Sequence, residues 1–158
     1  MTLAISLHII AAVIWVGGMF FAYMAQRPAA VEVLEPPLRL KLWVATFRRF
    51  FPWVWAAIIV LLATGFYGIF GYYGGMKGTP LYVHAMLGLG LLMMLIFFHV
   101  FFAPYKRLKA AVAAEDWPTG GKALSQIRVL VGINTIIGLV TAVLGAAGPY
   151  LIQMVHGG

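Results

Sequence analysis

Residues 81–103 read LYVHAMLGLGLLMMLIFFHVFFA, a run without a single Asp, Glu, Lys or Arg. A helix needs about 20 apolar residues to cross the hydrocarbon core of a bilayer, so this run is long enough to span it. Three further runs have the same character, at residues 3–25, 50–73 and 129–153. Backbone groups inside lipid must pair within their own segment, which makes each run a helix. We therefore predict an all-α integral membrane protein, in which residues 1–158 form a single bundle of four transmembrane helices.

The composition excludes a water-soluble protein. Hydrophobic residues make up 63% of the chain and charged residues only 9%, whereas soluble domains carry about 25% charged residues. The chain has no cysteine, which removes thiolate metal sites and disulfides. Its net charge of +7 comes from residues between the apolar runs, a placement that fits membrane topology and lipid headgroups. We therefore expect the lipid bilayer as a partner and no nucleic acid.

Lysine and arginine gather in two of the three connections. The first connection contains five of them and the third another five, whereas the second has only Lys77. These residues are Arg27, Arg39, Lys41, Arg48, Arg49, Lys106, Arg107, Lys109, Lys122 and Arg128. The positive-inside rule places both basic connections in the cytoplasm and both termini outside. The sequence thus predicts a multi-pass protein of the bacterial inner membrane.

The connections also predict where helices stop. Pro36-Pro37 should break the chain, with residues 38–49 leading into the second span. Residues 106–114 continue the helical pattern beyond the third span, and the segment 117–121 (WPTGG) is expected to interrupt it. Small residues such as Gly138 and Gly145 recur along the spans and favour close helix packing, although a dimer contact or room for a flat cofactor are alternatives.

Histidines are the candidate ligands inside the membrane. His8 and His84 lie near the outer ends of the first and third spans, which run parallel, so we expect the two rings at similar depth and able to hold one metal. His99 follows His84 by about 22 Å and is expected to face the same interior. Trp15 and Met19 share a face with His8, and Gly88 leaves space beside His84. The alternative is that each ring bonds only to water or backbone, as we expect for the terminal His156.

The segment LHIIAAVIWVGGMFF at residues 7–21, with Arg27-Pro28 after it, resembles the first helix of the CopD-like (copper-resistance protein D) membrane family. It is also distantly similar to HemJ-type protoporphyrinogen oxidases. Tyr82-Val83-His84-Ala85-Met86 and Phe98-His99 extend the likeness. The HemJ-type branch implies haem b, held with a histidine that His8 matches. Met86 stands where that branch has a lysine, which argues against its reaction.

The resemblance and the histidine pattern together lead to one main hypothesis. In it the chain binds haem b for electron transfer or quinone-linked redox chemistry, with His8 and His84 as axial ligands. Trp15, Met19 and Gly88 would shape the pocket, and His99 and Arg27 would hold a second cofactor, propionates or a quinone headgroup. An oxidoreductase activity, a quinone or redox partner protein, and a homodimer all stay open.

Two alternatives remain beside the haem hypothesis. The first is copper binding or transport of CopD type, in which His8, His84 and methionines are soft ligands suited to Cu(I). The second is a non-catalytic subunit of a membrane complex, with small-residue faces as its contacts.

Overall fold

The computed structural model describes residues 1–156, and this part of the chain is helical without a β-strand. The elements in chain order are α1 (Thr2–Phe21), the π-helical turn η1 (Ala22–Gln26), α2 (Arg27–Val33), α3 (Pro36–Phe66), the π-helical turn η2 (Tyr67–Tyr72), the 3-10 turn η3 (Met76–Gly78), α4 (Leu81–Phe102), α5 (Pro104–Ala113) and α6 (Trp117–His156). The side chain of His156 lies outside the described part.

Within residues 1–156, four helical stretches are long and apolar enough to cross a membrane. They are Thr2–Val33, Pro36–Tyr72, Leu81–Ala113 and Trp117–Tyr150. The predicted fold class, a four-helix transmembrane bundle, is confirmed. Each stretch is longer than its charge-free run, because the helices continue through the basic connections.

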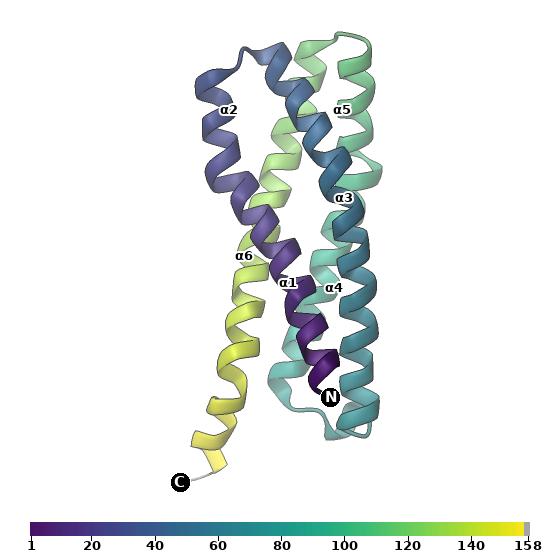
Figure 1. Cartoon of the computed structure of the whole chain (residues 1–158), viewed down its shortest axis with the longest axis vertical. Coiled ribbons are helices and arrows are strands. Elements are labelled where there is room, and N and C mark those ends of the chain that lie inside the picture. The colour runs from purple at the N-terminus through teal and green to yellow at the C-terminus, as the bar shows by residue number, and fades with distance from the viewer. Residues whose placement is uncertain (157–158) are drawn as a thin grey trace.

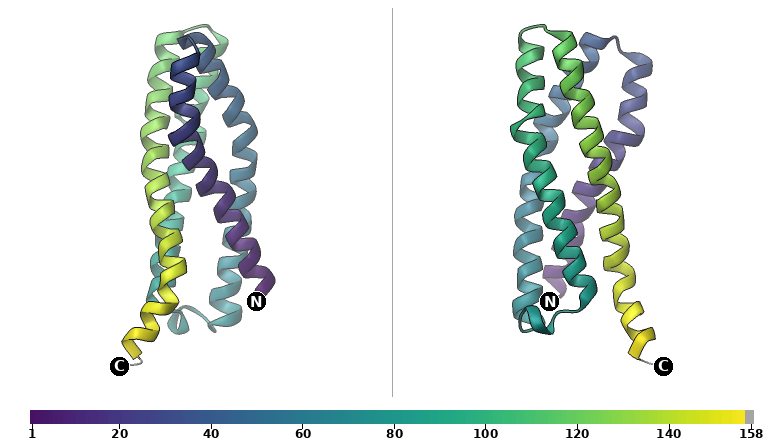
Figure 2. Two further views of the ribbon diagram at one scale, coloured as in Figure 1. Left: turned by 60° about the vertical axis from the view of Figure 1, so that its left-hand side comes forward. Right: turned by 180° about the vertical axis from the view of Figure 1, so that it is seen from behind.

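The four stretches run along the long axis of the molecule (Figures 1 and 2). One end carries both termini and the η2–η3 turn, and we call it the histidine end (residues 1–10, 64–90 and 138–156). The opposite end carries α2, α5 and the turns that follow them, and we call it the arginine end (residues 22–50 and 102–131). Toward the arginine end, α2 turns away from its neighbours, as both figures show.

Aromatic rings fill the space between α3 and α4–α5. Phe51 packs on Phe97 and on Tyr105 at centroid distances of 5.3 and 4.8 Å, and Trp55 stacks on Phe98 at 5.2 Å. Such pairs add about 0.5–1.5 kcal/mol each beyond simple burial. Because lipid gives helices little hydrophobic reason to associate, this interlocking of rings is a main source of the bundle's stability.

Glycines allow α6 to approach α1 and α4. A Cβ atom on Gly138 would lie 2.8 Å from Val16 Cγ2, and one on Gly145 would lie 3.0 Å from Met86 Cε. The prediction that these small residues serve helix packing is confirmed for both positions.

The prediction that residues 117–121 interrupt the helix is wrong. The break falls earlier, at Ala114–Asp116, where Glu115 has a φ of 54°, and α6 begins at Trp117. Pro118 is tolerated because backbone N–H groups in the first turn of a helix have no intrahelical partner. Asp116 Oδ1 accepts a hydrogen bond of 3.1 Å from the Thr119 N–H and so caps this turn.

Candidate functional site

His8 lies on α1 against α3, and its hydrogen bond fixes which ring nitrogen is free. Its Nδ1 lies 2.7 Å from Thr64 Oγ1, and that hydroxyl donates to the Val60 carbonyl at 2.6 Å. A threonine hydroxyl has one proton, so Thr64 accepts from His8 and the proton sits on His8 Nδ1. The lone pair of Nε2 is then free, as in histidines that bind metals and are oriented by a second hydrogen bond.

His84 has the same tautomer for a different reason. Its Nδ1 lies 3.1 Å from the Pro80 carbonyl oxygen one turn earlier in the chain. A carbonyl oxygen only accepts, so Nδ1 again carries the proton and Nε2 keeps its lone pair. Both half-buried histidines therefore offer Nε2 as a donor atom to a metal.

The two rings have different partners. His8 bonds to Thr64 on α3, whereas His84 bonds to the Pro80 carbonyl of its own helix. Trp15 on α1 meets Phe97 on the parallel helix α4, with ring centroids 6.2 Å apart. The equal depth of the two histidines stays a prediction, and no bis-histidine site is evident.

A third polar position lies at the centre of the bundle, in α6. The Asn134 side chain is 3% exposed, and its Nδ2 donates to the Met93 carbonyl at 3.3 Å and approaches Met19 Sδ at 3.7 Å. Asn134 Oδ1 is buried and has no hydrogen-bond partner. A buried polar atom without a partner costs about 1–3 kcal/mol, so this oxygen is a candidate to meet a ligand or a water molecule.

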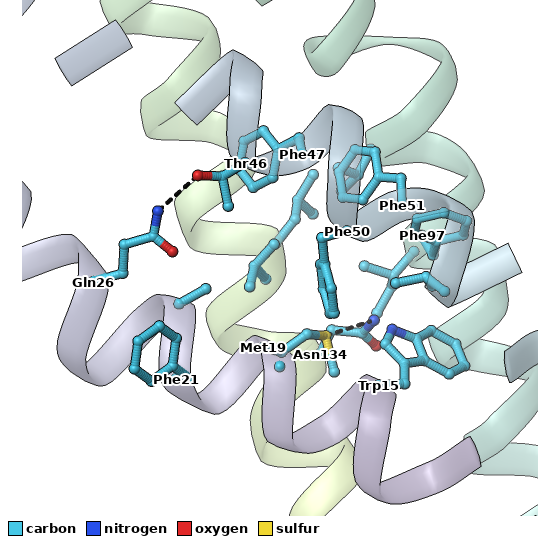
Figure 3. A pocket seen from close by; sticks show the side chains of 17 residues that line it. Trp15, Met19, Phe21, Gln26, Thr46, Phe47, Phe50, Phe51, Phe97 and Asn134 are labelled. Atoms are coloured by element: carbon cyan, nitrogen blue, oxygen red, sulfur yellow. Dashed lines mark hydrogen bonds between the residues drawn. The ribbon is translucent and has the colours of Figure 1, made fainter. Parts of the chain in front are cut away.

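Asn134 lines a cavity of about 180 Å³ enclosed by α1, α3, α4 and α6. Figure 3 shows the Asn134 amide facing the Met19 sulfur, with Trp15 and Phe50 beside them. A second polar pair lines the cavity farther along, where Gln26 Nε2 donates to Thr46 Oγ1 at 2.7 Å. The cavity is otherwise apolar and aromatic, the usual character of a small-ligand site with a few polar groups.

The remaining predicted residues separate into buried and exposed positions. Trp15 and Met19 are buried, 2% and 4% exposed, and both line this cavity. Gly88 and His99 are exposed, so the expectation that His99 faces the bundle interior is wrong. A Cβ on Gly88 would meet no atom within 4 Å. Arg27 lies away from the histidines, at the arginine end, with its guanidinium carbon 5.3 Å from the Tyr23 ring centroid.

Within the described residues, no group of three or more His, Cys, Asp or Glu side chains is placed to hold a metal. The imidazole and thioether side chains lie instead at separate positions along the bundle. Sequence reasoning named Asn134 only as a weak accessory donor. Its position among four apolar runs that contain no charged residue was the signal for a larger role, because a buried amide is costly there.

The family model described as Copper resistance protein D matches residues 44–147, about two thirds of the chain. The matched part contains His84, Met93 and Asn134 and does not include α1 with His8, Trp15 and Met19. No curated protein and no solved structure matches the chain.

Proposed function

Because the chain belongs to the copper resistance protein D family, we propose that it binds monovalent copper inside the membrane as a cargo ion. The donor types support this choice. Cu(I) is a soft ion that prefers thioether and imidazole ligands, and the chain offers both and no thiolate. The haem hypothesis has less support, because no bis-histidine site is evident: His8 bonds to Thr64 on α3 and His84 to the Pro80 carbonyl of its own helix.

One observation carries the proposal: Met19 and Asn134 line one cavity at the bundle centre, where Asn134 Nδ2 approaches the Met19 sulfur and Asn134 Oδ1 has no partner. A cation in the membrane interior needs compensating dipoles, since a buried unpaired charge costs several kcal/mol. The four apolar spans supply no carboxylate. The negative end of the Asn134 amide and a sulfur lone pair are the compensating groups available there.

The depths of the donors favour passage of the ion over storage. His8 and His84 both lie toward the histidine end, and Met19 follows His8 by eleven residues, or about 16 Å. A chelate would need several donors at one level, whereas transfer needs separate positions that bind weakly enough to release. We therefore propose that copper moves between these positions rather than resting in one tight site.

The test is copper retention by protein in lipid nanodiscs under reducing conditions, with and without the Met19 sulfur. Met19→Leu keeps the size of the side chain and removes the thioether, and Met24→Leu is the matched control because Met24 is exposed. We expect Met19→Leu to weaken Cu(I) binding at least about tenfold, measured by competition with a chromogenic Cu(I) chelator, and Met24→Leu to bind as the parent does. Equal binding by the two variants contradicts the proposal.

The absorption spectrum of the same preparations separates copper from haem. Under the copper proposal the purified protein is colourless and takes up copper, measured by elemental analysis, when it is equilibrated with Cu(I) under reducing conditions. A Soret band that disappears in His8→Ala would overturn the proposal in favour of haem. A preparation that contains no haem and takes up no copper would overturn it in favour of a non-catalytic subunit.

A further inference from the structure

A second pocket lies at the arginine end, between α2 and the first turns of α3 and α6. Its volume is about 250 Å³, and three arginines line it: Arg27, Arg39 and Arg128. Its lining residues belong to the region where α2 turns away from the other helices in Figure 1. No copper ligand proposed above lines it, so it is independent of the proposed function.

The charge of this pocket is one-sided. None of its lining residues is acidic, and neither Glu32 nor Glu35 of the neighbouring segment contributes to it. A guanidinium group presents a planar fork of donors that matches phosphate oxygens. Arg27 and Arg39 are half-buried, which reduces the screening of their charges by salt. The pocket is therefore suited to an anion with several oxygen atoms.

The walls of the pocket are apolar and aromatic. Trp43, Phe47 and Trp117 line it, together with leucine, isoleucine and valine side chains. Two cation–π contacts hold its rim, one between Arg27 and Tyr23 and one between Lys41 and Trp117 at 5.5 Å. A free inorganic anion gains nothing from such walls, whereas an amphipathic anion places its hydrocarbon part against them.

We propose that this pocket binds the phosphate of an anionic phospholipid, with the first part of an acyl chain against its aromatic wall. The pocket lies at the end of the membrane-spanning helices, where a headgroup meets the hydrocarbon. Basic pockets between transmembrane helices are known to recognise such headgroups. The three arginines bind the phosphate oxygens, and Trp43 and Phe47 contact the glycerol and upper chain.

The experiment compares two variants that lose the same charge. The pocket variant replaces Arg27, Arg39 and Arg128 by Gln. The control replaces Arg49, Lys106 and Lys122, which are exposed and do not line the pocket. Native mass spectrometry of protein released from nanodiscs of phosphatidylglycerol and phosphatidylethanolamine measures the lipid retained. Because the three guanidinium groups lose their charge-assisted contacts with the phosphate, the pocket variant should bind phosphatidylglycerol about 100-fold more weakly than the parent.

The control should retain phosphatidylglycerol as the parent does, and circular dichroism verifies that both variants are folded. Equal lipid loss in the two variants overturns the proposal, because it shows only a general attraction of positive charge to the membrane. A single Arg39→Gln variant serves if the triple variant does not fold, with about a fivefold loss expected against Arg49→Gln.

A separate measurement distinguishes a lipid from free phosphate. Lipid-free protein in neutral detergent is titrated with inorganic phosphate and, in parallel, with short-chain phosphatidylglycerol, with thermal shift as the readout. We expect stabilisation by the lipid that is lost in the pocket variant, and no stabilisation by phosphate up to millimolar concentration. Equal stabilisation by both ligands would overturn the assignment to a lipid.

Discussion

The two ends of the bundle are built in opposite ways. At the arginine end, side chains such as Leu108 and Ile127 are almost completely buried, and aromatic rings interlock between α3 and α4–α5. At the histidine end, no residue of 1–10 or of 81–92 is buried. Stability is therefore concentrated toward the arginine end. His8 and His84 lie where the packing is looser, whereas Met19 and Asn134 lie in the buried centre of the bundle. Loose packing leaves room for the two histidine side chains to adjust when an ion arrives or leaves.

We expect the largest effect on stability from removing an aromatic ring in the packed region between α3 and α4–α5. Phe97 contacts Trp15, Phe51 and Trp55 and is 4% exposed. Phe97→Ala leaves a cavity in a packed core, for which we expect a loss of about 3 kcal/mol in the free energy of unfolding. Denaturation by sodium dodecyl sulfate, followed by circular dichroism, measures this loss.

Phe70→Ala is the control for that measurement, because Phe70 belongs to η2 at the histidine end and is 60% exposed. It should change the free energy of unfolding by less than about 0.5 kcal/mol. Similar losses in the two variants would show that the ends do not differ in stability.

Two glycines of the histidine end compare a packed position with an open one. In Gly138→Val the new side chain meets Val16 and Met93, whereas in Gly88→Val it meets open space. Overpacking costs about 1–3 kcal/mol, so Gly138→Val should lower the free energy of unfolding by that amount and Gly88→Val by less than about 0.5 kcal/mol. Both variants have the same intrinsic helix propensity, which therefore cancels. If Gly88→Val were as damaging as Gly138→Val, the exposed face around Gly88 would be a contact surface.

The fold followed from the sequence because charge-free runs of more than 20 residues leave a chain few alternatives in lipid. The start of α6 did not, because WPTGG has the composition of a loop, whereas the helix begins at Trp117 with Asp116 as its cap, accepting from the Thr119 N–H. Local composition does not reveal a cap that depends on one side-chain geometry.

The site was predicted in part. Sequence reasoning selected His8, Trp15 and Met19, and the structure places all three toward the bundle, with Trp15 and Met19 on one cavity. It did not predict the different partners of the two histidines, Thr64 on α3 for His8 and the Pro80 carbonyl for His84. Such contacts depend on side-chain packing that no single span reveals. The direction of the His99 side chain was inferred from that of His84. Because His84 is only half-buried, it does not mark the interior face of α4, and His99 is exposed.

The smallest predicted effect lies in the turn before α6, at the arginine end but outside its packed core. Two hydrogen bonds hold the pKa of Asp116 below the ordinary value of 3.8. The larger effect comes from the Thr119 side chain and the smaller one from the Thr119 backbone N–H. A carboxyl group whose pKa is lower in the folded state contributes stability above the unfolded value and loses it as the pH falls through the folded value. Asp116→Asn keeps a capping side chain and removes the titration. The parent should therefore melt slightly above Asp116→Asn near neutral pH. This difference should shrink as the pH falls below 3.8 and vanish once the pH is below the folded-state pKa of Asp116. Because the carboxylate is exposed, solvent screening keeps the difference small.

A difference in melting temperature that is the same at both pH values would show that the turn is held by the backbone of Ala114–Asp116 rather than by the charge.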